Sequence, residues 1–106
     1  MMYRLRVYTL KDSASLAVYR DVYYPRHFGS FAEFGISIHG IWTSPEDDAP
    51  RLYVLTSFPT DADPVQIERD YMQSPGFKAD MEGFDRSNIV RVETTLLAPT
   101  DASPLR

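Results

Sequence analysis

The hydrophobic residues of this chain follow two different periods. Apolar and polar residues alternate at every second position, the period of a β-strand, in four segments: 2–10, 36–43, 51–58 and 88–98. Apolar and aromatic residues instead recur every three or four positions over about 14–34 and 64–84, which predicts helices. The predicted order is strand, helix, strand, strand, helix, strand.

Polar residues and prolines set the expected ends of the first helix. Asp12 or Ser13 suits its N-terminus, because a short oxygen side chain accepts a hydrogen bond from an unpaired backbone N–H. Pro25 removes one helical hydrogen bond, so we expect a kink or break there. Gly35 follows the last apolar position and is the expected C-terminal stop.

The second helix is expected in two pieces. Asp63–Pro64 fits an N-cap followed by a first-turn proline, and Ser74–Pro75 repeats the same signal. We therefore expect helices over about 64–73 and 75–84.

This order of elements is that of the split βαβ arrangement. We expect an α+β, ferredoxin-like βαββαβ fold, in which a four-stranded antiparallel sheet with strand order 4-1-3-2 carries two helices on one face. One domain is expected over residues 1–98. Residues 99–106 contain two prolines and little apolar surface, so they are expected to form a flexible tail.

The two faces of the predicted sheet differ in character. The face expected to pack under the helices is aliphatic and holds Leu5, Val7, Ile36, Ile38, Leu52, Val54, Val90, Val92 and Leu96. The other face holds Arg4, Arg6, Tyr8, Leu10, His39, Ile41, Tyr53, Leu55, Arg91 and Glu93. That second face is too apolar for open solvent, so a second copy of the chain is its expected cover, in a homodimer or a higher homo-oligomer.

Composition narrows the class of protein. The chain has 106 residues, enough for a single domain, and a formal charge of −4, which argues against nucleic-acid binding. It has no cysteine, which excludes disulfides, thiolate nucleophiles and cysteine-ligated metals. No segment approaches the roughly 18 apolar residues of a membrane span, and the first residues do not follow a signal-peptide pattern. A cytoplasmic location is expected.

Several short motifs resemble the NIPSNAP family. Residues 3–11, YRLRVYTLK, are similar to the opening strand of that family, and residues 40–44, GIWTS, to its second strand. Residues 74–77, SPGF, are a looser match, and the resemblance spans residues 3 to about 97. It implies a dimeric α+β barrel in which two sheets pack back to back. In related barrels a small hydrophobic ligand lies between sheet and helices, and most family members have no settled activity.

The chain has two histidines, His27 and His39. His27 lies within the first helix, where it could transfer a proton or ligate haem, or be a buried helix residue bonded to the backbone. His39 lies on the expected covered face, where it could face a polar pocket or belong to the interface between subunits.

Two further groups of residues could form a site. Arg6, Arg91 and Glu93 could bind a carboxylate or enolate oxygen, or make an ion pair across a dimer contact. The aromatic residues that could stack on a flat ligand, or else simply fill the core, are Tyr19, Tyr23, Trp42 and Tyr71.

The leading hypothesis is a protein that binds a small hydrophobic or aromatic molecule in a cleft between sheet and helices. If it is an enzyme, we expect one that needs no cofactor or metal, with monooxygenase-like or isomerase-like chemistry. Its expected catalytic residues are His27, Tyr23 and Arg6, and its expected ligand-binding residues are Trp42, Tyr19, Tyr71 and His39. The alternatives are a non-catalytic homodimeric scaffold whose cleft is filled by side chains, and a haem-handling barrel with His27 or His39 as axial ligand.

Overall fold

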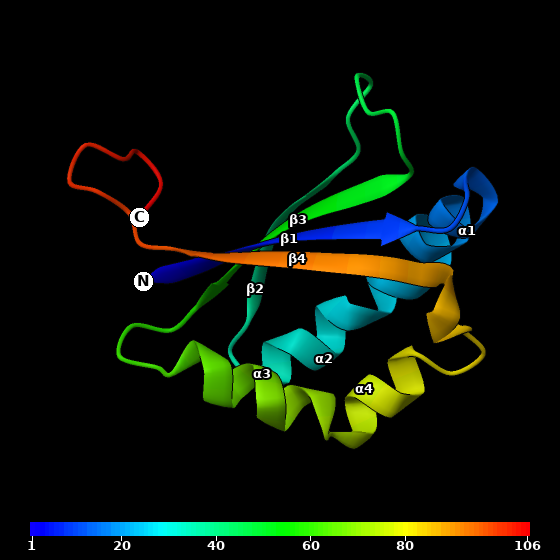
Figure 1. The fold of residues 1–106 in the computed structure, drawn as a ribbon. Helices are drawn as coiled ribbons and strands as arrows, with labels where there is room; N and C mark the ends of the chain where they lie inside the picture. The colour runs from blue at the N-terminus through cyan, green and yellow to red at the C-terminus, as the bar shows by residue number, and fades with distance from the viewer.

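The computed structural model describes residues 1–106, and it has the predicted order of strands and helices (Figure 1). Its elements are β1 (Met2–Leu10), α1 (Ser13–Val18), η1 (Tyr19–Tyr23), η2 (Tyr24–Arg26), α2 (His27–Glu33), β2 (Ser37–Trp42), β3 (Arg51–Phe58), α3 (Pro64–Met72), α4 (Pro75–Asp80), η3 (Arg86–Asn88) and β4 (Ile89–Leu97). The antiparallel sheet has the order β2-β3-β1-β4, which confirms the predicted topology and the ferredoxin-like α+β fold.

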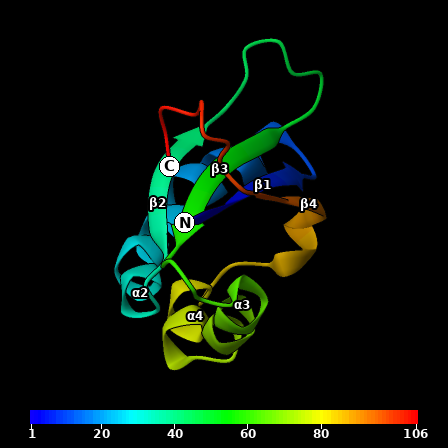
Figure 2. The ribbon, with the colours of Figure 1, turned by 90° about the vertical axis from the view of Figure 1, so that its left-hand side faces the viewer.

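The helices gather on one side of the sheet, and the loop between β2 and β3 projects away from α3 and α4 (Figure 2). None of these helices has the length and apolar character that a membrane crossing requires. After β4, residues 100–103 form a turn closed by a hydrogen bond from Ser103 N–H to Thr100 O. The flexibility of the tail stays a prediction.

The first helical region is broken as the sequence predicts. The Asp12 side chain accepts a hydrogen bond from Ser15 N–H and caps α1. The helix then widens into the π-helix η1, tightens into the 3₁₀ turn η2 around Pro25, and resumes as α2. Pro25 cannot donate a backbone hydrogen bond, which accounts for the change of winding. Gly35, with a φ of 74°, follows the end of α2 as expected.

The second helical region also begins at its predicted caps. The Asp63 side chain accepts hydrogen bonds from the first turn of α3, and the Ser74 side chain accepts one from Phe77 N–H in α4. Next to that cap, an added Cβ at Gly76 would lie 3.2 Å from Ser30 Cβ. The absence of a side chain at Gly76 therefore lets α4 approach α2 closely.

Two hydrophobic clusters fill the space between sheet and helices. The larger contains Tyr8, Leu10, Tyr19, Tyr24, Leu52 and Val54. The smaller contains Phe31, Ile36, Phe58 and Tyr71. Tyrosine and phenylalanine side chains from the helices thus supply much of the volume that packs on the aliphatic centre of the sheet.

The predicted faces of β1 are reversed in the structure. Tyr8 and Leu10 belong to the core under the helices, and Arg4 and Arg6 bond Glu68 of α3. The residues that pair across β1 show the same arrangement, since Arg6 lies opposite the buried Val54. The prediction is wrong because the charges of Arg4 and Arg6 suggest a solvent-facing strand face. In the structure both side chains lie on the helix side, where long arginine side chains can cover apolar surface while their guanidinium groups bond Glu68.

A register shift in β2 changes a second face assignment. The pairing with β3 is irregular between Ile38 and Gly40. As a result Ile38 and Ile41 both pack against the core under the helices, although the sequence places them on opposite faces. A strict two-residue period cannot predict such a bulge, because one extra residue exchanges the faces after it.

Candidate functional site

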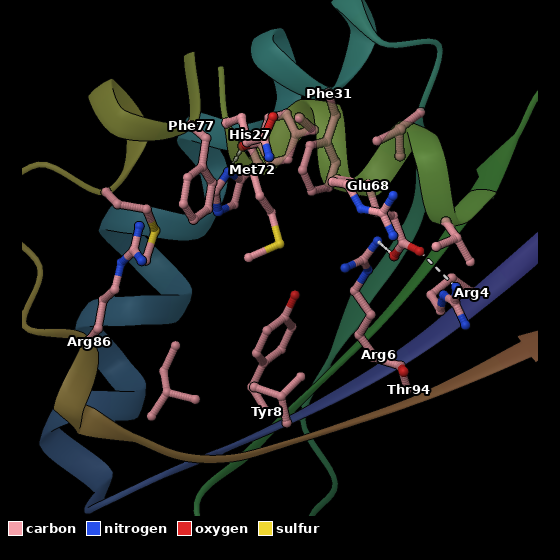
Figure 3. Close-up of a pocket in the computed structure, with 18 of the residues that line it drawn as sticks. Arg4, Arg6, Tyr8, His27, Phe31, Glu68, Met72, Phe77, Arg86 and Thr94 are labelled. Atoms are coloured by element: carbon pink, nitrogen blue, oxygen red, sulfur yellow. Dashed lines mark hydrogen bonds and ion pairs between the residues drawn. The ribbon is translucent and has the colours of Figure 1, made fainter. Parts of the chain in front are cut away.

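A cleft of about 730 Å³ lies between the sheet and the pair α3–α4 (Figure 3). Tyr8 points into it from β1, and Met72 and Phe77 reach it from α3 and α4. Hydrophobic side chains make up 11 of its 19 lining residues. A cleft of this size and character suits a small, largely apolar molecule.

A buried polar cluster adjoins this cleft and joins α2, α3 and α4. His27 Nδ1 lies 2.6 Å from Tyr71 Oη and 3.1 Å from Asp80 Oδ2. Tyr71 donates a 3.0 Å hydrogen bond to Asp80 Oδ2, and Ser30 Oγ donates to the same oxygen. All four residues are buried, so the cluster fixes their side chains relative to one another.

The hydrogen bonds of this cluster assign the tautomer of His27. Asp80 Oδ2 already accepts from Ser30 and Tyr71, and it faces Nδ1 at 3.1 Å. A lone pair on Nδ1 would repel that carboxylate, so Nδ1 carries the hydrogen and donates it. The second nitrogen, Nε2, makes no hydrogen bond within the chain and keeps its lone pair, and His27 itself lines the cleft.

Burial sets the proton affinities of the aromatic residues around the cleft. It lowers the pKa of His27, although the hydrogen bond to Asp80 works in the opposite direction. Burial also raises the pKa values of Tyr19, Tyr24 and Tyr71. At neutral pH the site therefore holds a neutral imidazole beside protonated phenols, a base next to hydrogen-bond donors.

A charged cluster lines the cleft where β1 faces α3. Arg4 Nη2 lies 2.7 Å from Glu68 Oε1, and Arg6 Nη2 lies 2.5 Å from Glu68 Oε2. The three side chains are largely buried, and the Nε atoms of both arginines lack a hydrogen-bond partner. Two guanidinium groups thus share one carboxylate, which leaves one positive charge uncompensated.

Four of the seven residues predicted for the site line the cleft: Arg6, Tyr19, His27 and Tyr71. His27 and Tyr71 are in direct contact, Tyr19 packs edge-on against Tyr8, and Arg6 lies two residues before Tyr8 on the same face of β1. Their predicted roles in binding and catalysis stay predictions.

The remaining three lie elsewhere. Tyr23 packs on Phe84 and under the guanidinium of Arg26, outside the cleft lining. Trp42 is 51% exposed and covers Gly40 on β2. His39 lies on the sheet face away from the helices, where its Nε2 is 2.7 Å from Ser57 Oγ.

The predicted cluster of Arg6, Arg91 and Glu93 does not form. Arg91 and Glu93 make an exposed ion pair of 3.3 Å with each other, on the sheet face opposite Arg6. The reversal of β1 is the reason, because it takes Arg6 to the helix side.

Ser30, Glu68 and Asp80 are not among the residues predicted for the site, and neither are Arg4, Arg69 and Arg86, which line the cleft. Glu68 had a usable signal, since it lies three residues before Tyr71 and shares its helical face. Asp80 and Ser30 had none, because the contacts that bring them to His27 join different helices. No cluster of three or more His, Cys, Asp or Glu side chains capable of holding a metal ion is present.

The NIPSNAP family model matches residues 3–104, nearly the whole chain. The chain belongs to the NIPSNAP family. This agrees with the resemblance of its opening strand, and the ferredoxin-like topology is the one that the resemblance implies. No curated protein matches the sequence.

Solved structures of other NIPSNAP proteins share this fold. An uncharacterized NIPSNAP domain protein from Burkholderia xenovorans superposes with a TM-score of 0.79 at 13% identity, covering 98% of this chain and 99% of that one. A NIPSNAP family protein with unknown function from Agrobacterium tumefaciens gives 0.75 at 22% identity, covering 100% and 94%. A candidate antibiotic biosynthesis monooxygenase from Nitrosomonas europaea gives 0.65 at 11% identity, covering 93% and 98%. At these identities the likeness concerns the fold alone.

Proposed function

We propose that this NIPSNAP protein binds a small, flat hydrophobic molecule in the cleft and that His27 takes a proton from it. The observation that carries this proposal is the buried Asp80–Tyr71–His27 cluster. It holds the Nδ1–H tautomer and leaves the Nε2 lone pair of a neutral imidazole beside an apolar cleft. A carboxylate that orients a histidine in this way supports general-base catalysis in many enzymes.

The proposed step transfers one proton and shifts two electron pairs. The proton of an acidic C–H bond, next to a carbonyl group of the ligand, passes to His27 Nε2. The electron pair of that C–H bond forms the carbon–carbon double bond of an enolate, the π pair of the carbonyl moves to its oxygen, and Asp80 stabilises the imidazolium. The guanidinium of Arg6, which shares Glu68 with Arg4 and lines the same cleft, is the cation that we assign to offset the new oxyanion. This step is common to isomerase-like and cofactor-free monooxygenase-like chemistry.

The two alternatives draw less support from the geometry. A scaffold role predicts a cleft filled by side chains, whereas about 730 Å³ is open here. A haem-handling role would have one candidate ligand in the cleft, His27, because His39 lies on the opposite sheet face.

Proton exchange on a model ketone tests the proposal directly. 2-Tetralone is a compact bicyclic ketone with one aromatic ring and acidic C–H groups next to its carbonyl. In D₂O, we expect the protein to accelerate the loss of those proton signals in the NMR spectrum, by about 100-fold over buffer, a typical general-base effect. The His27→Gln variant should lose the acceleration. The Asp80→Asn variant should lose about tenfold or more, because it no longer holds the required tautomer.

His39→Gln is the matched control, since it removes the other histidine of the chain from outside the cleft. It should exchange 2-tetralone as fast as the wild type. Equal exchange rates for the wild type and a folded His27→Gln variant would contradict the assignment of His27 as the base.

We also propose that the protein works as a homodimer through the sheet face away from the helices. Trp42 and Leu97 are 51% and 41% exposed on that face, and Leu5, Val7 and Leu55 lie beside them half-buried. Such an apolar sheet face favours a protein partner. The cytoplasmic location stays a prediction.

A further inference from the structure

The cleft concentrates positive charge in an acidic protein. Its lining contains four arginines, Arg4, Arg6, Arg69 and Arg86, and a single carboxylate, that of Glu68. The chain as a whole has a formal charge of −4. A general attraction for anions is therefore absent, and any preference for a negative ligand must come from the cleft itself.

The two arginines of β1 are only partly neutralised. Glu68 bonds one Nη2 atom of Arg4 and one of Arg6, and the Nε atoms of both are buried without a partner. These groups lie at about one-seventh side-chain exposure, 12% and 15%, where solvent screens a charge less than at the surface. This end of the cleft has capacity for a further negative group.

The opposite end carries a free arginine at the rim. The guanidinium of Arg86 lies 4.8 Å from the centre of the Phe77 ring and makes no ion pair. Figure 3 shows Arg86 and Phe77 on one side of the cleft, Arg6 on the other, and Met72 and Tyr8 between them. An apolar body lying between Met72 and Tyr8 would thus have a cation at each end.

We infer that the ligand of this cleft is an amphipathic anion, with a flat apolar body and a carboxylate-type head group that meets Arg86. The inference rests on the proposed function and specifies its ligand class. The head group pairs with the one rim arginine that stands on an aromatic lining residue, and the enolisable end of the molecule faces His27 and Arg6. A neutral ligand of the same shape would contact the same apolar side chains but would leave the charge of Arg86 without a negative partner.

Three naphthalene probes of equal shape and different charge test this inference. They are 2-naphthoate, 2-naphthalenemethanol and 2-naphthylmethylammonium, each titrated into the protein by calorimetry. We expect the carboxylate to bind about tenfold more tightly than the alcohol, and the ammonium more weakly than both. Added salt should weaken binding of the carboxylate and leave that of the alcohol unchanged.

Two variants should change the preference in opposite directions. Arg86→Gln, an exposed position, should reduce the preference for carboxylate over alcohol about threefold. Glu68→Gln removes the one lining carboxylate and should tighten carboxylate binding about threefold, which mere loss of structure would not do. Arg20→Gln, an exposed arginine outside the cleft, is the matched control and should bind all three probes as the wild type does.

The outcomes separate the two proposals. Equal affinities for carboxylate and alcohol, or a preference that survives Arg86→Gln and does not rise in Glu68→Gln, overturn the anion inference and leave the proposed cleft function standing. If none of the three probes binds, both proposals fall together.

Discussion

His27 is a buried titratable residue, so its charge state should affect stability. Burial lowers the pKa of its imidazole in the folded chain, with Asp80 opposing that shift. The unfolded chain then protonates this histidine at a higher pH than the folded chain does. Acidification below the ordinary histidine pKa of about 6.5 therefore favours unfolding. We expect the midpoint temperature of thermal unfolding to fall when the pH is lowered from about 7.5 to about 5.5.

The His27→Gln variant should lose most of this dependence, and His39→Gln should keep it. The carboxylates of Asp12, Asp47 and Asp85 have pKa values lowered by hydrogen bonds, so they titrate below this range and do not mask the effect. A wild-type midpoint that stays constant over the same range would show that folding does not depress the proton affinity of His27.

At this scale the sequence identifies the residues that a helical period places on one face. The period of the first helix predicts Tyr19, Tyr23 and His27 on one face, and of these Tyr19 and His27 line the cleft whereas Tyr23 does not. Their polar partners were missed, because Asp80 and Ser30 meet His27 through contacts between helices that no local spacing encodes.

Two glycines, one inside α2 and one just after it, have different conformational requirements. Gly35 has a φ of 74°, which residues with a side chain adopt only at a cost in conformational energy. An added Cβ there would also lie 2.9 Å from Pro59 Cγ. At Gly29, inside α2, an added Cβ would meet nothing within 4 Å. The same substitution should therefore have opposite effects on stability. We expect Gly35→Ala to lower the free energy of unfolding by about 1–2 kcal/mol, and Gly29→Ala to raise it by about 0.5–1 kcal/mol.

Urea denaturation of the two variants measures both effects. Equal stability changes for Gly29→Ala and Gly35→Ala would mean that the positive φ and the Pro59 contact at Gly35 carry no cost, and that Gly35 is not needed for the turn after α2.

The boundaries of the elements are well predicted because local chemistry sets them. Asp12, Asp63, Ser74 and Gly35 each act on their own neighbours, and the structure confirms each as a cap or stop. Local sequence does not decide which face of β1 points toward the helices. Both of its faces carry apolar residues, so the choice between them depends on Glu68, which lies on a helix far along the chain.

At the scale of the whole molecule, topology follows from the order of the elements, since a βαββαβ chain with short connections has few ways to build one sheet. The strand order was predicted correctly for this reason. The family resemblance and the aromatic residues both predict a cleft, but its volume depends on how far α3 and α4 stand from β1 and β4, which no local pattern encodes.

The proposed homodimer depends on the whole sheet face that points away from the helices. The sheet face away from the helices brings Leu5 opposite Leu55, and Val7 opposite Tyr53, across neighbouring strands. Trp42 lies opposite Tyr53 on the next strand. A partner sheet that covers this face would remove these side chains from water, which is the main driving force in such interfaces.

A charge in the middle of that face should separate the subunits. We expect the wild type to have the mass of a dimer in light scattering and Leu55→Glu that of a monomer, because the glutamate would be buried without a partner. Val22→Glu, at an exposed apolar residue of η1, is the matched control and should stay dimeric. The cleft lies on the other side of the sheet, so a folded Leu55→Glu monomer should still bind 2-naphthoate. A wild type that scatters as a monomer would contradict the dimer, whereas a monomer that loses binding would show that the second subunit shapes the cleft.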